Sequence, residues 1–412
     1  MKQNFIYVKK VNAKIDKIAS LNPFSCPLNL WKEKRAEIVP GLSYNRVKAM
    51  SPIISKSAQK LTTYLTNEYT NNCETIDAKE ISLKYTADIV AGIGWGIESG
   101  SFHSTTDNNK KTSFIEMSKK MVYQTLLGFR FFFISGIFPF IKYIYEERFF
   151  PEETNRYFSQ LAEASIKLRN TAVNKNESQD FFQYLLDLKH KKQLTNDEFV
   201  GHQLTFHYDS FETAAISICH CLLLLARYPY TQKKLRNEIQ KYTDPKTGLL
   251  KFDDLMIMPY LEQCIAETLR VYAPLPFSSK ICTESCEFEN NDGVLVRLKP
   301  GDVCFISLQS FQNDEKYFPQ PDVFMPERFD KENGGTKRYK DMGVFLPFGD
   351  GPRICIGMNF VLAEIKTAVV EIIKHFELTV NERTRQDNYR ETDGFMTGLE
   401  GGVHLNIKPL KL

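Results

Sequence analysis

The chain has 412 residues, of which 42% are hydrophobic and 25% are charged, so it is long and apolar enough to bury a large core. Its formal net charge of +3 is close to balance and gives no indication of nucleic-acid binding. The nine cysteines are odd in number and irregularly spaced, which indicates no disulfide framework and favours a reducing compartment.

The N-terminal part of the chain predicts helices. The first residues are basic but contain no apolar run as long as a signal peptide or a membrane anchor. Helical periodicity covers residues 42–71 and 77–97. The most apolar stretch, residues 126–145, is interpreted either as a buried helix pair or as a segment that enters a bilayer surface without crossing it.

A long helix is predicted in the middle of the chain. Thr195 and Glu198 have the spacing of a capping box, so the helix should begin there and end before Pro229. It contains residues 219–221, Cys-His-Cys, whose side chains point about 100° apart on a helix and cannot close round one ion. We interpret them as core residues. Further helices are expected after Pro229 and over residues 259–272.

In the last third of the chain, the predicted elements change from mainly helices to short strands and loops. Asn-Asp-Gly at 291–293 lies between short alternating runs and predicts a hairpin. An apolar helix is expected over residues 359–375, and Gly401-Gly402 predicts a final hairpin. We expect one domain over residues 1–412, mainly α with a small β-rich part (α+β). Its helix-rich body covers about 22–275, and its β-rich region with the cysteine loop covers about 276–412.

The strongest motif is FGDGPRICIG, residues 348–357. A cysteine thiolate donates electron density to iron and favours cleavage of an O–O bond, and it needs a tight loop that shields it. Glycines allow such a loop to turn sharply and bring backbone N–H groups towards the sulfur. The alternative is a buried structural cysteine in a glycine turn. The residues that fit the first interpretation are Phe348, Gly349, Gly351, Arg353, Cys355 and Gly357.

This motif resembles the cysteine loop of the cytochrome P450 family, and two further motifs occur in the family's order. Residues 267–270 match Glu-x-x-Arg, and residues 326–329 match Pro-Glu-Arg-Phe. The resemblance implies that Cys355 is the axial ligand of a haem b iron. It also implies a structural triad of Glu267, Arg270 and Arg328, in which each buried charge has a partner.

The resemblance also implies how the haem is held. Trp31 and Arg35 match the family's Trp-x-x-x-Arg, whose indole N–H and guanidinium can both reach a haem propionate. Lys280 stands where related enzymes place a basic propionate partner, although a solvated lysine is an equal alternative. Arg353 is expected to pair with a propionate, while Phe348, Gly349 and Gly357 belong to the same cofactor-binding loop.

In the predicted long helix, residues 209–213 (Asp-Ser-Phe-Glu-Thr) are similar to the family's Ala/Gly-Gly-x-Asp/Glu-Thr. In the family, the acid and alcohol, here Glu212 and Thr213, organise water and supply protons for breaking the O–O bond. Asp209 and Ser210 depart from the pattern. The extra carboxylate of Asp209 is expected either to face water or to favour substrates that carry a donor or a cation.

The implied function is a haem-thiolate monooxygenase that inserts one oxygen atom from O2 into a lipophilic xenobiotic, steroid or fatty-acid-like molecule. Electrons would come from NADPH through NADPH–cytochrome P450 reductase, with cytochrome b5 as a second donor, docking on basic residues such as Lys32 and Lys34. The residues around the motifs are most similar to those of insect microsomal members. This resemblance implies that the protein lies at the cytosolic face of the endoplasmic reticulum membrane.

Two alternatives remain open from the sequence. Only thirty residues precede Trp31, whereas the family implies an anchor, a first helix and the first strands there, so we expect a shortened chain. Such a chain could bind haem or lipid without turnover. A rearranging or dehydrating haem-thiolate enzyme, which needs no reductase, is the other alternative.

Overall fold

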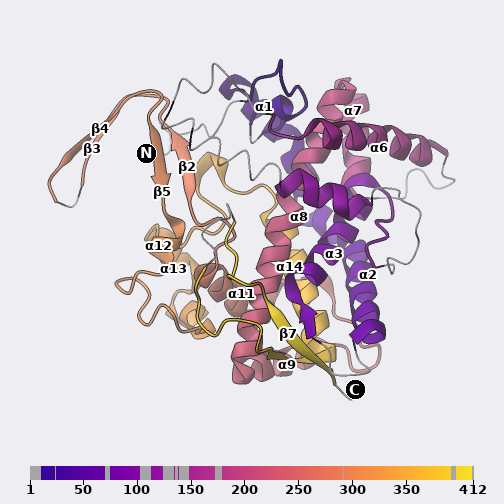
Figure 1. Ribbon diagram of the computed structural model, residues 1–412, viewed down its shortest axis with the longest axis vertical. Helices are drawn as coiled ribbons and strands as arrows, with labels where there is room; N and C mark the ends of the chain where they lie inside the picture. The colour runs from indigo at the N-terminus through magenta and orange to yellow at the C-terminus, as the bar shows by residue number, and fades with distance from the viewer. Residues whose placement is uncertain are drawn as a thin grey trace.

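The structure, a computed structural model, describes a defined part of the chain: residues 11–23, 25–69, 75–102, 113–123, 134, 138, 148–171, 179–290, 292–390 and 396–410. Helices dominate these residues, and three small antiparallel sheets accompany them (Figure 1). The prediction of a mainly α protein with a small β-rich part is therefore confirmed. The apolar stretch 126–145 lies outside the described residues, except for two isolated positions.

The helices and strands have the following bounds. The α-helices are α1 (Leu28–Ile38), α2 (Tyr44–Tyr69), α3 (Ala78–Val90), α6 (Glu152–Thr171), α7 (Phe181–Lys192), α8 (Asn196–Arg227), α9 (Pro229–Tyr242), α10 (Phe252–Ile257), α11 (Pro259–Val271), α12 (Leu308–Gln312), α13 (Gly335–Asp341) and α14 (Met358–His375). The strands are β1 (Thr75–Asp77), β2 (Ser278–Ile281), β3 (Cys286–Glu289), β4 (Leu295–Leu298), β5 (Val303–Ile306), β6 (Phe376–Val380) and β7 (His404–Pro409).

Helix α8 runs through the middle of the molecule (Figure 1). It begins with the predicted capping box: the Thr195 hydroxyl accepts from the Glu198 N–H at 3.3 Å, and the Glu198 carboxylate accepts from the Thr195 N–H at 2.9 Å. Among the described residues, α8 alone is long and apolar enough to cross a membrane. Its most apolar window is 89% buried inside the protein, which is typical of a core helix.

The predicted helices of the body are confirmed. Helices α2, α3, α9 and α11 occupy the expected ranges, and α14 follows the cysteine loop. Helix α3 packs along α8, and α14 packs against α2, α8 and α9, so that their apolar faces share one core. Residues Cys219 to Cys221 lie in this core, where His220 stacks on Tyr272 at 4.3 Å between ring centroids. Their interpretation as core residues agrees with this placement.

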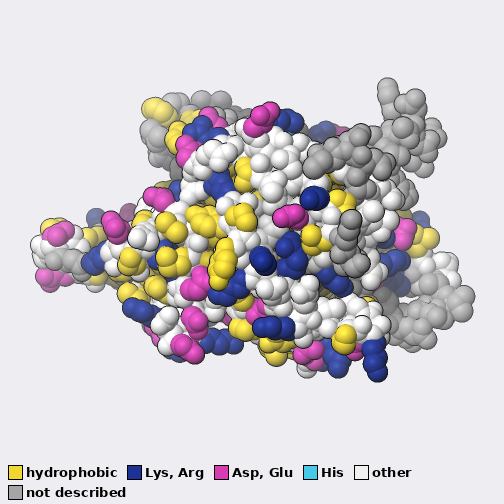
Figure 2. Space-filling view, turned by 90° about the horizontal axis from the view of Figure 1, so that it is seen from below, with side chains coloured by type: hydrophobic (Ala, Val, Ile, Leu, Met, Phe, Trp, Pro, Cys, Tyr) yellow, Lys and Arg dark blue, Asp and Glu magenta, His cyan; other side chains and the backbone are white. Residues whose placement is uncertain are grey.

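The predicted hairpin near residue 292 is formed by β3 and β4, with Phe288 opposite Val296. The side chain of Asn290 accepts from the N–H groups of Asp292 and Val294, and Gly293 has a positive φ of 76°, which a tight turn requires. The hairpin projects from the body as an arm beside the pair β2–β5 (Figure 1). Figure 2 shows hydrophobic side chains gathered between this arm and the middle of the molecule.

The expected hairpin at Gly401-Gly402 is wrong. Strand β7 pairs instead with β1 and β6 on its two sides, in the order β1–β7–β6. Ile76 lies opposite Leu405, and Leu378 lies opposite Ile407. The glycines make a turn into β7, but the partner strands come from distant parts of the chain, which a local turn signal cannot identify.

Candidate functional site

The cysteine loop is a turn that leads directly into α14. A short helical turn, η6 (Gly351–Arg353), precedes Cys355, and the Cys355 N–H donates to the Phe348 carbonyl at 2.9 Å. Gly349 and Gly351 have φ values of +72° and +75°, a conformation that other residues adopt only with strain. The Gly357 N–H donates a hydrogen bond to the Cys355 sulfur. The loop therefore has the backbone geometry predicted for a metal-binding thiolate.

The Cys355 side chain is exposed, although burial is the main cause that raises the pKa of its thiol to about 11. The sulfur is therefore accessible, although neighbouring protein groups displace much of the water around it. The Asp209 carboxylate on α8 adds to the rise in pKa, whereas the Gly357 N–H and the charge of Arg35 oppose it. The Asp209 carboxylate is therefore near enough to act on the Cys355 thiol electrostatically. Iron would displace the thiol proton on binding.

Cationic side chains surround the loop. Arg35 on α1 donates to the Ile354 carbonyl at 2.6 Å, next to Cys355. Arg353 donates to the Pro23 carbonyl at 2.7 Å, and its guanidinium lies 4.2 Å from the centre of the Trp31 ring. Burial lowers the pKa of Lys280 on β2, and the charge of Arg353 lowers it further. The structure thus gathers the predicted propionate partners on one side of the cysteine loop.

These residues fit a haem. The Trp31 indole N–H is buried and has no acceptor among the described residues, so it is a donor left for an anionic group. Arg35, Arg353 and Lys280 add positive charge on the same side of the loop, and a haem presents two anionic propionates. The Cys355 sulfur, with its N–H donor, is the group on this loop that would bind haem iron as a thiolate.

On α8, Glu212 and Thr213 lie on different sides of the helix. The Thr213 hydroxyl donates to the Asp209 carbonyl at 2.6 Å and belongs to the face that carries Asp209. The Glu212 carboxylate is buried and forms an ion pair with Lys79 of α3, with 3.0 Å between Nζ and Oε1. Its second oxygen has no partner among the described residues. Lys79 was not predicted, because no local pattern marks it.

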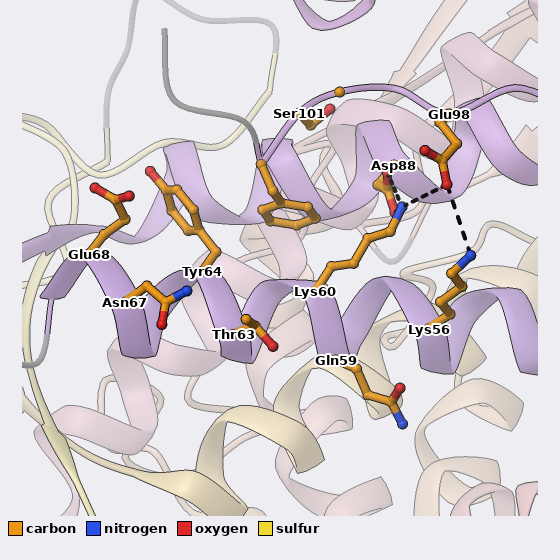
Figure 3. Close-up of a pocket in the computed structure, with 12 residues that line it drawn as sticks. Lys56, Gln59, Lys60, Thr63, Tyr64, Asn67, Glu68, Asp88, Glu98 and Ser101 are labelled. Carbon is orange, nitrogen blue, oxygen red and sulfur yellow. Dashed lines mark hydrogen bonds and ion pairs between the residues drawn. The ribbon is translucent and has the colours of Figure 1, made fainter. Parts of the chain in front are cut away.

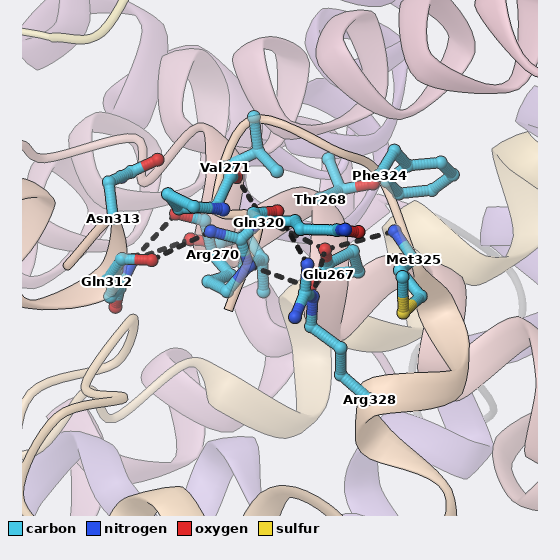
Figure 4. A network of polar contacts seen from close by, with 12 residues as sticks. Glu267, Thr268, Arg270, Val271, Gln312, Asn313, Gln320, Phe324, Met325 and Arg328 are labelled. Carbon is cyan, nitrogen blue, oxygen red and sulfur yellow. Dashed lines mark hydrogen bonds and ion pairs between the residues drawn. The ribbon is translucent and has the colours of Figure 1, made fainter. Parts of the chain in front are cut away.

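The three residues of the predicted triad meet in one network of polar contacts (Figure 4). Glu267 and Arg270, both completely buried on α11, form two parallel hydrogen bonds of 2.8 and 2.9 Å. Arg328, in the short helix η4 (Pro326–Phe329), donates to the same carboxylate at 3.2 Å. The Met325 N–H adds a fourth bond to it, at 3.1 Å. One carboxylate therefore joins α11 to the segment that precedes the cysteine loop.

The expected basic patch with Lys34 is wrong. The Lys34 side chain is only 5% exposed, and it pairs with Glu198 at 2.7 Å and with Glu37 at 3.3 Å. It therefore joins α1 to the start of α8 and is not a surface charge. Lys32, on the same helix, is exposed as expected.

A buried carboxyl group in α14, Glu364, was missed. Neither of its oxygens has a hydrogen-bond partner among the described residues, and burial holds its pKa well above the usual range. Tyr85 donates to its backbone carbonyl and not to the carboxyl group. The signal in the sequence is an acidic residue within the apolar run Phe360 to Ile365 of this helix. A buried carboxyl group without a partner stays protonated.

Glu364→Gln is expected to make stability less dependent on pH. The folded protein holds the Glu364 proton more tightly than the unfolded chain does, so the free energy of unfolding falls as pH rises above the unfolded pKa of about 4.3. This fall in the free energy of unfolding approaches about 1.4 kcal/mol per pH unit, and it ends when the pH reaches the pKa of Glu364 in the folded protein. Urea unfolding between pH 5 and 8 should show a shallower decline for the variant, and equal slopes would contradict this assignment.

A separate cleft of about 400 Å³ lies between α2 and residues 98–102 (Figure 3). Its charges are mutually compensated, since Lys60 reaches the Asp88 carboxylate at 3.1 Å and Glu98 at 3.9 Å. It contains none of the predicted site residues. Within the described residues, no group of three His, Cys, Asp or Glu side chains has the arrangement of a metal site. The cysteine loop and α8 thus remain the candidate site.

Comparisons with known proteins agree with this site. The family described as Cytochrome P450 matches residues 14–405. "Probable cytochrome P450 28d1" of Drosophila melanogaster is 39% identical over 401 residues, which cover 97% of this chain and 78% of that protein. "Lithocholate 6-beta-hydroxylase" of Mesocricetus auratus is 32% identical over 367 residues, covering 86% of this chain and 69% of the hydroxylase.

Proposed function

Because this chain belongs to the cytochrome P450 family and is a monooxygenase of that family, we propose that it inserts one oxygen atom from O2 into a lipophilic small molecule. NADPH would supply the electrons through NADPH–cytochrome P450 reductase, with cytochrome b5 as a second donor. The observation that carries the proposal is the exposed Cys355 thiol, held in a loop of glycine turns that donates the Gly357 N–H to its sulfur.

When bound, haem b supplies the oxygen-activating chemistry. In this proposal Cys355 is the axial ligand, and Phe348, Gly349 and Gly357 shape the loop around it. Trp31, Arg35, Lys280 and Arg353 hold the propionates, which satisfies the buried indole N–H and compensates the cationic side chains. Glu267, Arg270 and Arg328 keep the loop in place.

Glu212 and Thr213 would serve proton supply from two sides of α8. Lys79 is 39% exposed, so its ion pair with the buried Glu212 connects the interior to the surface. The Thr213 hydroxyl lies on the face with Asp209 and can pass a hydrogen bond between water and a bound reactant. This division of roles needs water between the two side chains, because the partners of Glu212 and Thr213 lie on different sides of the helix.

The substrate class, the cellular location and the docking partner of the enzyme are proposed from its relatives. The name of the Mesocricetus auratus relative describes hydroxylation of lithocholate, a steroid, which supports a lipophilic substrate. The cytosolic face of the endoplasmic reticulum membrane is proposed as its location by family resemblance. Exposed basic residues such as Lys32 would contribute to reductase docking.

Isotope labelling tests the proposed function. The haem-loaded protein, the reductase and NADPH are incubated under 18O2 with a lipophilic probe such as lithocholate and a panel of steroids and fatty acids. The proposal predicts a product with one 18O atom, formed only with NADPH and reductase. Haem uptake without any product or NADPH consumption would favour a non-catalytic binding protein. A product that forms without reductase and carries no label would favour a rearranging or dehydrating enzyme.

A further inference from the structure

A cluster of charged and polar side chains joins α1 to α7 and α8. At its centre is the Glu37 carboxylate near the end of α1, which is only 1% exposed. Its oxygens accept hydrogen bonds from His202 of α8 at 2.8 Å, Lys192 of α7 at 3.0 Å and Lys34 of α1 at 3.3 Å. Lys34 also donates to Glu198 at the start of α8, at 2.7 Å. We call these five residues the Glu37 cluster, which links three helices through one carboxylate.

His202 takes part in this cluster as a hydrogen-bond donor. The imidazole is completely buried, and its proton lies on Nε2, because the carboxylate of Glu37 can only accept. Burial alone would raise the pKa of Glu37, but hydrogen bonds from His202 and Lys192 lower it to about 2. Glu37 is therefore ionised at neutral pH. A hydrogen bond to an ionised acceptor is stronger than one between neutral groups.

The Glu37 cluster fixes the rotation of α1 about its own axis. The buried residues of this helix are Trp31, Lys34, Glu37 and Ile38, so charged groups occupy part of the side that faces the protein interior. Apolar packing has no preferred direction, whereas the hydrogen bonds of Lys34 and Glu37 require one orientation. A rotation by one residue, which is about 100°, would break these bonds and turn Trp31 away from its present position.

Two side chains beside the cysteine loop depend on this orientation. The Trp31 ring lies 4.2 Å from the Arg353 guanidinium, and its buried indole N–H has no acceptor among the described residues. Arg35 donates to the Ile354 carbonyl at 2.6 Å. Trp31 and Arg35 precede Glu37 by less than two turns of the same helix, so the cluster and the loop contacts hold α1 in one orientation.

We propose that His202 is a positioning residue that holds α1 in place through Glu37. In this orientation α1 directs Trp31 and Arg35 towards the propionates of the haem. The inference rests on the proposed function, because it concerns the residues that would hold the same cofactor. Without the His202 contact, α1 can turn or shift, so the propionates lose partners while the Cys355 loop is unchanged.

Transfer of haem to an excess of apomyoglobin tests this role. The protein is loaded either with haem b or with its dimethyl ester, whose esterified propionates carry no charge. His202→Ala should release haem b about tenfold faster than the unchanged protein does. The same variant should release the dimethyl ester at the rate of the unchanged protein. His202→Gln, whose amide can donate to Glu37, should restore the slow release of haem b.

His207→Ala is the matched control. His207 is also completely buried on α8, but its ring bonds to Trp95 at 3.2 Å and to Ser118 at 2.9 Å, and neither partner belongs to α1. Its loss should change the release of haem b and of the ester by the same factor. An equal change for both haems in His202→Ala, or an unchanged release of haem b, would overturn the positioning role. If His202→Ala does not fold, Glu37→Gln, which keeps the shape of the side chain, provides the same comparison.

The outcomes separate this inference from the proposed function. Incorporation of 18O, measured on the same samples, reports the monooxygenase reaction independently. A protein whose release of haem b depends on His202 but that forms no labelled product would support the positioning role and contradict the proposed reaction. A labelled product, together with a release of haem b that does not depend on His202, would overturn the positioning role and support the reaction.

Discussion

Cys355→Ala is expected to reduce NADPH-dependent oxygenation to background while the protein stays folded. Thiolate donation to iron is lost with the sulfur, and residues 348–357 contain no second Cys and no His. The fold should survive because the Cys355 side chain is exposed, so its truncation leaves no cavity in the core. Haem content, product formation and thermal unfolding of the same sample measure these effects.

Cys26→Ala is the matched control for this prediction. Cys26 is buried, its pKa is raised to about 11 by burial, and Arg353 lies near enough to oppose that rise. Its removal should lower the free energy of unfolding by about 1 kcal/mol through a small cavity and leave turnover per haem unchanged. Turnover in Cys355→Ala within tenfold of the unchanged protein would contradict the assignment of the ligand.

Glu267→Ala is expected to destabilise the protein by about 3–5 kcal/mol. The substitution leaves Arg270 and Arg328 in the interior without their shared carboxylate, and the cost of a buried unpaired charge is the reason for the size of the effect. Because whole proteins have only about 5–15 kcal/mol of stability, a large loss of folded protein should follow. Urea unfolding of the variant measures the change.

The exposed pair of Glu287 and Arg297 on the β3–β4 arm is the control, since the two side chains are 56% and 70% exposed. Glu287→Ala should change the free energy of unfolding by no more than about 1 kcal/mol, because water screens and solvates both charges. The loss in free energy of unfolding for Glu267→Gln should lie between those for Glu267→Ala and Glu287→Ala, since the amide keeps one acceptor oxygen. Equal effects of Glu267→Ala and Glu287→Ala would show that the triad does not stabilise the fold as described.

Features with a local cause could be predicted from the sequence. The capping box at Thr195 sets the start of α8 within one turn, and the glycine turns of the cysteine loop follow from residues 348–357. The triad was predictable although its members are far apart, because the resemblance to the cytochrome P450 family implies it from two motifs. Helix geometry argued against a metal ion shared by Cys219 to Cys221, and their interpretation as core residues agrees with their burial.

Features that depend on distant partners could not be predicted. Lys34 is buried because Glu198, 164 positions later, meets it, and nothing near Lys34 distinguishes it from the exposed Lys32. The partner of Glu212, Lys79, lies on a different helix. Strand β7 pairs with β1, where Thr75 and Asn406 are 331 positions apart, so the local turn at Gly401-Gly402 indicated the wrong partner. Tertiary contacts decide each of these cases.

The carbon monoxide difference spectrum of the reduced, haem-loaded protein tests the central claim most directly. If Cys355 is the axial ligand, the Soret band is red-shifted to the position that only a thiolate-ligated carbonyl gives, and Cys355→Ala lacks this band. A band at the position of a neutral or lost thiolate, or a chain that takes up no haem, would contradict the haem-thiolate site on which the proposed function rests.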